Sequence, residues 1–207
     1  MKAWAVMAVA SLLAFSAPAE AGGPLDRVQS AVAAVIKIVT RPDLQGPTHL
    51  VARRALLRKV ADDFFDFPEM ARSSLGYHAA TPSEKERAEF VVLFTDLLER
   101  SYVTTVENYA GEQIVYVSET SEANHATVRS KILTTRGAEI GIDYRLRRSA
   151  AGWLAFDVVL ENVSLAANYR AQINRVLRTT SFATLLARMR AGQLTAMAIP
   201  RRAGKLQ

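Results

Sequence analysis

The stretch HATVRSKILTTRGAEIGIDYRLR, residues 125–147, decides the fold, because apolar and polar side chains alternate along it on both sides of a turn. A period of two is typical of β-strands with one buried and one solvated face. The predicted buried face carries Val128, Ile132, Ile140, Ile142, Tyr144 and Leu146. The other face carries Thr127, Arg129, Lys131, Glu139, Asp143 and Arg145. The stretch therefore predicts two antiparallel strands that cover a core on one side.

The same alternation constrains the turn between these strands. Even-numbered residues of both strands must share the buried face, so the numbers of paired residues must have an even sum, which excludes a two-residue loop. We predict a loop over residues 135–137 in which Gly137 adopts the left-handed conformation. This register places Arg129 opposite Asp143 on the outer face.

Two further period-two segments flank this pair, at residues 113–117 and 153–163, with Asn, Gly and Ser turns between them. The sequence therefore predicts a four-stranded antiparallel meander. Its last strand is apolar on both faces, and Val158 and Leu160 belong to the side that continues the buried face.

Helical periodicity precedes and follows the sheet. Apolar stripes predict helices over residues 25–39 and 50–64, a short helix that is preceded by Asp66 or Phe67 and ended by Gly76, and a long helix to about Tyr109. Thr81-Pro82-Ser83-Glu84 fits a capping box for the long helix. Ser164 is predicted to cap the first of two C-terminal helices.

The predicted fold class is α+β: a twisted four-stranded antiparallel sheet, packed on one face by N-terminal and C-terminal helices. No βαβ alternation and no repeat is present. We expect one domain over residues 22–190, followed by a basic, frayed tail over residues 191–207.

The N-terminus has the order of regions found in a secretory signal peptide. Lys2 is followed by an apolar run over residues 3–17, Pro18, and the small-residue pattern Ala19-Glu20-Ala21. The run is shorter than the roughly 20 residues that span a bilayer, which favours cleavage over anchoring. We predict that residues 1–21 are removed by cleavage after Ala21 and that the protein works outside the cytoplasm.

Composition narrows the possible partners. The net charge of +6 persists after cleavage and favours anionic surfaces or acidic partners, whereas nucleic acid is not expected for an exported chain. The chain has no cysteine, which excludes disulfides and thiol chemistry. A basic group in the second helix, Arg53, Arg54, Arg58 and Lys59, is either a solvated face or the contact surface of a protein-binding adaptor.

The residues that could carry chemistry do not converge. His49, His78 and His125 lie apart without metal-ligand spacing, and no nucleotide-binding or hydrolase motif is present, so we expect no metal, no cofactor and no catalytic residues. Asp157 is the one carboxylate on a central strand, and burial could make it a general base in a cone-shaped α+β enzyme. More often, such an aspartate bonds a neighbouring backbone group or an arginine, and we favour that interpretation.

The buried sheet face could fill a solid core or line a cavity, and periodicity does not distinguish the two. A cavity for an acyl chain would be lined by apolar side chains from the sheet and from the helices that cover it. The candidate lining residues are Tyr102, Val106, Val128, Ile132, Ile140, Ile142, Tyr144, Val158, Leu160, Tyr169 and Ile173, with Arg170 on the headgroup side.

Several segments, taken together and in order, resemble the MlaC or toluene-tolerance family of periplasmic phospholipid-binding proteins, auxiliary components of an ABC transporter. The resemblance covers nearly the whole chain after the leader. It is carried by residues 65–72 (FDFPEMAR), Leu75-Gly76, residues 90–102, Tyr144-Arg145-Leu146, Gly152-Trp153, Phe156-Asp157-Val158-Val159 and residues 163–170 (VSLAANYR).

The resemblance implies a non-enzymatic carrier that holds phospholipid tails in a deep apolar cavity. Its family role is to shuttle lipid between an outer-membrane lipoprotein complex and an inner-membrane ABC transporter with a lipid-binding ring component, which maintains outer-membrane lipid asymmetry. We expect a monomer. Family members also occur beside hopanoid-synthesis genes, so another amphiphile is an alternative cargo. The Trp that usually follows Leu-Gly is missing after Leu75-Gly76.

Overall fold

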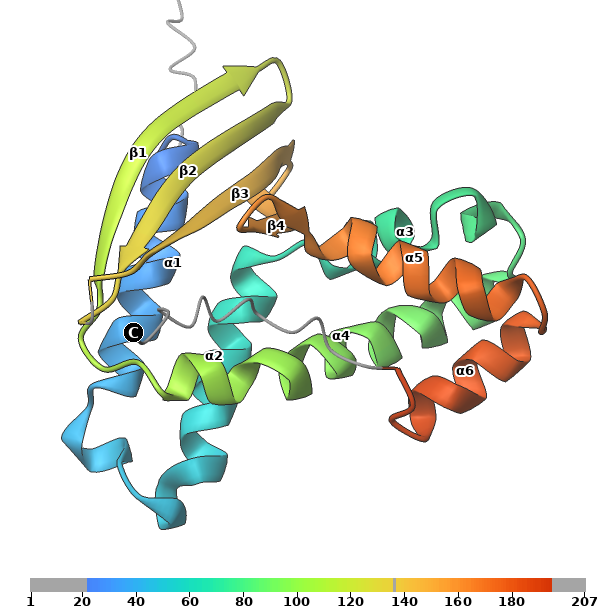
Figure 1. The fold of residues 1–207 in the computed structure, drawn as a ribbon, viewed down its shortest axis with the longest axis horizontal. Coiled ribbons are helices and arrows are strands. Elements are labelled where there is room, and N and C mark those ends of the chain that lie inside the picture. Colours follow the sequence, from blue (N-terminus) through green and yellow to red (C-terminus); the bar gives the residue numbers. More distant parts are fainter. Residues whose placement is uncertain (1–21, 136, 195–207) are drawn as a thin grey trace, which may run out of the picture.

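The computed structural model, which describes residues 22–135 and 137–194, is an α+β fold built on a curved antiparallel sheet (Figure 1). The helices before the sheet are α1 (Pro24–Val39), α2 (Leu50–Phe64), α3 (Phe67–Leu75) and α4 (Glu84–Glu107). Three short 3-10 turns lie between them: η1 (Pro42–Leu44), η2 (Pro47–His49) and η3 (Gly76–Ala80). The helices α5 (Leu165–Leu177) and α6 (Phe182–Arg190) follow the sheet.

The sheet has five strands in the described chain, not the four that the sequence predicts. They are β1 (Gln113–Glu122), β2 (His125–Leu133), β3 (Glu139–Ser149), β4 (Gly152–Leu160) and β5 (Val163–Ser164), paired in sequence order. The error arises at Glu161 and Asn162, which both adopt positive φ, at 47° and 65°. Two such residues make a tight hairpin turn, and Glu-Asn is a weak signal for it compared with Asn-Gly.

The predicted register of the central strands is confirmed. Arg129 pairs with Asp143, and their charged atoms, Nε and Oδ2, lie 3.7 Å apart on the outer face. Gly137 adopts a φ of 77° in the connecting loop, as the parity of the pattern requires. The alternation of apolar residues therefore fixed both the pairing and the turn geometry.

The start of α4 lies two residues later than predicted. Ser83, not Thr81, is the N-cap, and it forms a capping box with Glu86: the Ser83 amide donates to Oε2 at 2.9 Å, and the Glu86 amide donates to Oγ at 3.3 Å. Thr81 closes η3 in a helical backbone conformation, so it does not have the extended conformation that an N-cap needs.

Two hydrophobic cores hold the fold together. The first lies under the sheet, where Val128, Leu146 and Ala155 pack on Val28 and Ala31 of α1 and on Phe64 of α2. The second joins α3, α4, α5 and α6, which extend away from the sheet past β4 (Figure 1). The C-terminal helices therefore pack mainly on α3 and α4 rather than on the sheet, because their apolar stripes meet Phe90 and Phe94.

Three predictions concern the ends of the chain. The signal peptide over residues 1–21 and residues 195–207 of the predicted tail lie outside the described residues. Leu194 does belong to the helical core, with 9% of its surface exposed, so packing continues beyond the predicted domain end at residue 190. Among the described helices, none combines the length and hydrophobicity that spanning a membrane requires.

Candidate functional site

The face of the sheet that is turned toward α1 and α2, here called the inner face, is built from transverse rows of side chains. The first row, at the end of the sheet nearest the start of β1, consists of Ile114, Ile132 and Ile140. The second consists of Tyr116, Ser130, Ile142 and Leu160, and the third of Glu119, Val128, Tyr144 and Val158. The inner face is thus largely apolar, with two tyrosines inside it.

The helices cover the inner face of the sheet unevenly. Val128 and Leu146 are fully buried beneath the helices, and Leu160 is also buried. By contrast, several apolar residues of the first three rows keep part of their surface uncovered: Ile114, Tyr116, Ile132, Ile140, Ile142, Tyr144 and Val158. An apolar surface this continuous is rarely left incompletely covered in a monomeric protein unless it binds something.

A groove of about 560 Å³ opens beside the first row, between α1 and the start of β1. Val32 and Ile36 of α1 form one wall, and Ile114 and Tyr116 of β1 form the other. The groove is open to solvent rather than enclosed, and Gln29, Glu112 and Gln113 also line it. The groove therefore gives access to the half-covered end of the inner face.

The polar groups in these rows are Ser130, Tyr116, Tyr144 and Glu119, and the Glu119 carboxylate accepts a hydrogen bond from the Leu25 amide at 2.9 Å. The Ser130 hydroxyl donates to the Ile142 carbonyl oxygen at 2.9 Å, so the sheet itself uses this group. Burial raises the pKa of both Tyr116 and Tyr144, and the proximity of Tyr116 adds to the effect at Tyr144. Both hydroxyls therefore remain neutral at physiological pH and can donate hydrogen bonds.

The predicted lining residues separate into two groups. Val128, Ile132, Ile140, Ile142, Tyr144, Val158 and Leu160 do share the inner face, and Tyr102 and Val106 lie half-buried in the C-terminal half of α4. Tyr169 and Ile173 do not share it: both are fully buried in the helical core, where the Tyr169 ring meets Phe94 edge-on at 5.4 Å. Strand parity found the first group, whereas the packing direction of α5 decided the second.

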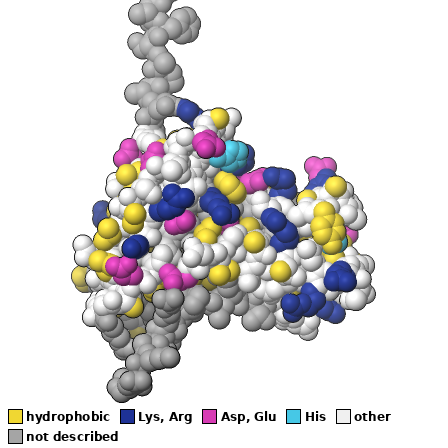
Figure 2. Space-filling model, turned by 45° about the horizontal axis from the view of Figure 1, so that its top comes forward, with side chains coloured by type: hydrophobic (Ala, Val, Ile, Leu, Met, Phe, Trp, Pro, Cys, Tyr) yellow, Lys and Arg dark blue, Asp and Glu magenta, His cyan; other side chains and the backbone are white. Residues whose placement is uncertain are grey.

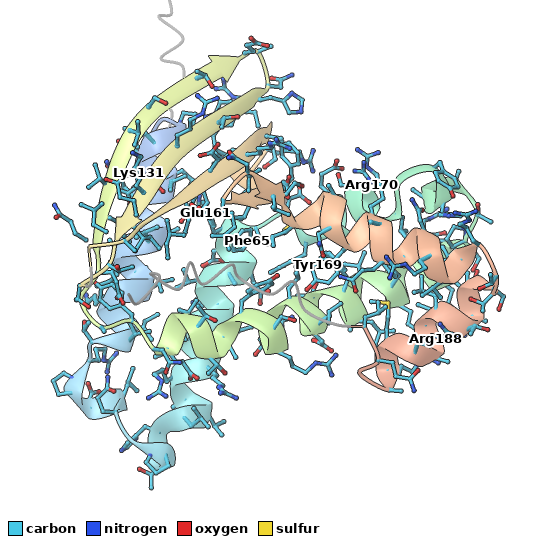
Figure 3. The ribbon with its side chains drawn as sticks, in the orientation of Figure 1. Phe65, Lys131, Glu161, Tyr169, Arg170 and Arg188 are labelled. Atoms are coloured by element: carbon cyan, nitrogen blue, oxygen red, sulfur yellow. The ribbon has the colours of Figure 1, made fainter. Side chains whose placement is uncertain are left out.

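Arg170 ties α5 to α3 and to the turn after it (Figure 3). Its Nε donates to the Ser73 carbonyl oxygen at 2.8 Å, and its methylenes lie on Gly76, where a Cβ would come within 2.9 Å of Cδ. Together with Arg145, Arg170 borders a polar pocket of about 580 Å³ at the start of α5. The structure thus explains why glycine follows Leu75: Gly76 has a φ of 57° and leaves room for the Arg170 side chain.

The carboxylate of Asp157 is fully engaged. Its Oδ1 accepts from the Ala166 amide at 3.1 Å, while its Oδ2 accepts from the Ser164 hydroxyl at 2.6 Å and from Arg145 at 3.2 Å. Asp157 is only 3% exposed. These bonds fix the start of α5, so Asp157 is a helix-capping group and has no oxygen left free to act as a general base.

Asp66 plays the matching role at the start of α3. Its Oδ1 accepts from the Glu69 amide at 3.0 Å, its Oδ2 accepts from Arg147 Nε at 2.5 Å, and its own amide donates to the Ala155 carbonyl oxygen at 2.8 Å. Arg145 and Arg147 are neighbours on the outer face of β3. The carboxylate of Asp157 on β4 therefore holds the start of α5, and the Arg147–Asp66 pair joins β3 to the start of α3.

The basic group of α2 is not a free surface, which corrects the expectation that it stays in water. Arg53 and Arg54 both bond Glu107 of α4, at 3.2 and 3.0 Å, and the Glu107 side chain is 7% exposed. Arg58 bonds Glu99 at 2.5 Å. Lys59 remains exposed, but the adaptor hypothesis loses the motif on which it rested, because the arginines hold α2 against α4.

The described residues contain no group of three or more His, Asp or Glu side chains that could hold a metal ion. His125 stacks edge-on against Phe156 at 5.8 Å, and His78 stacks on Tyr77 at 4.0 Å. His125 and His78 therefore make ring contacts at separate places in the fold, and His49 is exposed.

Fold and site together define an α+β protein with a partly uncovered apolar sheet face and no assembled catalytic group among the described residues. A family model described as MlaC protein matches residues 29–191, and the chain belongs to this family. A phospholipid-binding protein from Ralstonia solanacearum, solved in complex with a phospholipid, is similar in structure, with a TM-score of 0.71 and 22% identity. The match covers 80% of this chain and 94% of that one, and it shows the fold. No curated protein matches the chain.

Proposed function

We propose that this protein is a periplasmic lipid carrier that holds the acyl chains of a phospholipid against the inner face of its sheet. The observation that carries the proposal is the continuous, half-covered apolar surface of the first three rows, which opens into the groove beside Ile114 and Tyr116. Membership of the MlaC family supports it, as does the phospholipid bound to the Ralstonia solanacearum protein.

Physical chemistry explains why such a carrier needs an apolar face and no reaction. Each methylene removed from water is worth about 0.8 kcal/mol, so two acyl chains do not cross an aqueous space unshielded at useful rates. A half-covered inner face removes this barrier, and the neutral hydroxyls of Tyr116 and Tyr144 can donate to ester or headgroup oxygens of the cargo.

The proposed cellular role follows from family membership. After cleavage behind Ala21, the protein would work as a monomer in the periplasm of a Gram-negative cell. It would shuttle lipid between an outer-membrane lipoprotein complex and an inner-membrane ABC transporter with a lipid-binding ring component, and thereby maintain outer-membrane lipid asymmetry.

The test is native mass spectrometry of the protein purified from a periplasm, followed by extraction and identification of the lipid. The proposal expects a stoichiometric mass excess that extracts as phospholipid. Extraction of a hopanoid instead would support the carrier function but would change the identity of its cargo. A bare mass that stays bare after incubation with phospholipid vesicles would contradict the proposal.

A matched pair of variants locates the site. Ile132→Gln places a polar group in the first row of the inner face, whereas Lys131→Gln changes the neighbouring residue on the outer face. We expect lipid occupancy to fall several-fold in Ile132→Gln, because burying an unpaired amide costs roughly 1–3 kcal/mol. Lys131→Gln should load like the wild type, and equal occupancy in both variants would move the site elsewhere.

A further inference from the structure

The charge of this chain is distributed very unevenly. Residues 162–207 contain eight Lys and Arg and no Asp or Glu, whereas 18 basic and 20 acidic side chains precede them. The whole positive excess therefore lies in the segment that forms α5, α6 and the residues after them. Such asymmetry is a feature of chains that bind anionic surfaces.

Every exposed residue within α5 and α6 is either Ala or Arg. The exposed alanines are Ala167, Ala171, Ala183 and Ala187, and the exposed arginines are Arg170, Arg175, Arg188 and Arg190. Arg178, which caps the end of α5, is exposed as well. Figure 2 shows dark blue side chains gathered at the end of the molecule that these helices form.

Three of these arginines have no carboxylate partner in the described part of the chain. Arg190 forms an ion pair with Glu89 of α4, and Arg170 donates a hydrogen bond to the Ser73 carbonyl oxygen. Arg175, Arg178 and Arg188 form no ion pair with any residue in 22–135 or 137–194, and all three are exposed; Figure 3 labels Arg188 on α6. These three residues are called the C-terminal basic face below.

We propose that the C-terminal basic face binds the surface of an anionic phospholipid bilayer through its phosphate groups. Protein interfaces usually centre on a buried aromatic or aliphatic anchor, and the exposed positions of α5 and α6 offer only Ala and Arg. Alanine side chains between the guanidinium groups leave the exposed positions of these helices without a bulky apolar anchor. The proposal concerns the outside of the molecule and does not depend on acyl-chain binding at the inner face.

The expected strength follows from the number of charges. A basic residue close to an anionic membrane is worth about 1 kcal/mol, which is roughly fivefold in partitioning, so three should give on the order of a hundredfold. The binding should weaken strongly as the salt concentration rises, because the Debye length then falls from about 14 to 4 Å.

The experiment is co-sedimentation of the mature protein with vesicles that contain about one third phosphatidylglycerol in phosphatidylcholine, at low and high salt, with pure phosphatidylcholine vesicles alongside. The test variant is R175Q/R178Q/R188Q. The matched control is K37Q/K59Q/R100Q, which removes the same charge from exposed positions of α1, α2 and α4. We expect salt-sensitive binding to the anionic vesicles only, lost in the test variant and kept in the control.

Three outcomes would overturn the proposal. The first is an equal loss of vesicle binding in the control variant, which would mean that only net charge matters. The second is no binding at low salt, which would leave an acidic protein as the partner. The third is equal binding to neutral vesicles. Circular dichroism checks folding, because Arg175 and Arg188 also stabilise the C-terminal ends of their helices. Native mass spectrometry of the same variants reports cargo separately, so a failure here is distinguishable from a failure of the carrier function.

Discussion

At the scale of single residues, the segments that carry the family resemblance are mainly structural. Asp66 and Asp157 cap α3 and α5 and bond the two outer-face arginines of β3, while Phe65 makes a parallel bridge with Ala155. These contacts place the helical layer beside the sheet. These residues therefore hold the frame around the proposed site, and the apolar rows provide its surface.

Gly76 offers the sharpest test at this scale. Gly76→Ala should destabilise the protein by roughly 2–4 kcal/mol, because it adds a clash with Arg170 to the strain of a positive φ. Gly46→Ala is the control: Gly46 has a φ of 84° but nothing within 4 Å of its would-be Cβ. Urea unfolding measures both variants, and Arg170→Ala in the Gly76→Ala background should recover part of the loss. Equal losses in the two glycine variants would contradict the packing role of Arg170.

At the scale of secondary-structure elements, charge rather than apolar contact holds much of α2 in place. Only Leu57 and Phe64 of α2 are buried, while Arg53, Arg54 and Arg58 bond carboxylates of α4. Hydrogen bonds from Arg54 lead the causes that lower the pKa of Glu107. The attachment of α2 therefore depends on Glu107 being ionised.

Glu107→Gln should cost roughly 1–3 kcal/mol of unfolding free energy, since it removes the counter-charge of Arg53, whose side chain is 13% exposed. The Arg54 side chain is 38% exposed and adds less. Because the pKa of Glu107 is lowered in the folded state, its contribution is present above the ordinary Glu value of 4.5 and disappears as the pH falls through the folded value. The gap between wild type and variant should therefore close in acid. Urea unfolding across pH measures it.

Asp43→Asn serves as the control for this prediction, because the Arg41–Asp43 pair is solvent-exposed and should contribute little to the free energy of unfolding. A wild-type advantage over Glu107→Gln that persists unchanged well below pH 4.5 would argue against the ion pairs as its cause.

At the scale of the whole molecule, a bound lipid should stabilise the fold as a unit. Phe65 contacts both hydrophobic cores and lies between the sheet and the helical layer (Figure 3). A ligand at a hundredfold excess over its dissociation constant contributes about 2.7 kcal/mol, which corresponds to roughly 5–10 °C in Tm for a chain of this size. Calorimetry of delipidated and reloaded protein measures the shift, and identical Tm values would contradict binding within the fold.

The sequence by itself determined the α+β class, the central register, Gly137 and the apolar side of each strand, because alternation and turn chemistry are local and strict. It also predicted the cap at Ser164, and it left the residue before α3 open between Asp66 and Phe67, of which Asp66 is the cap. Both caps depend on neighbouring amides. Its errors at Glu161-Asn162 and at Thr81 occurred where two local solutions compete and packing selects one.

Only the tertiary structure decided which predicted lining residues meet. Tyr169 and Ile173 have the same apolar character as Ile132 and Ile140, yet α5 turns them into the helical core. Likewise, the arginines of α2 are paired because α4 brings Glu107 beside them, about 50 residues later in the chain. Periodicity specifies which side of an element is apolar or charged, but the partner of that side depends on long-range packing, which no local pattern encodes.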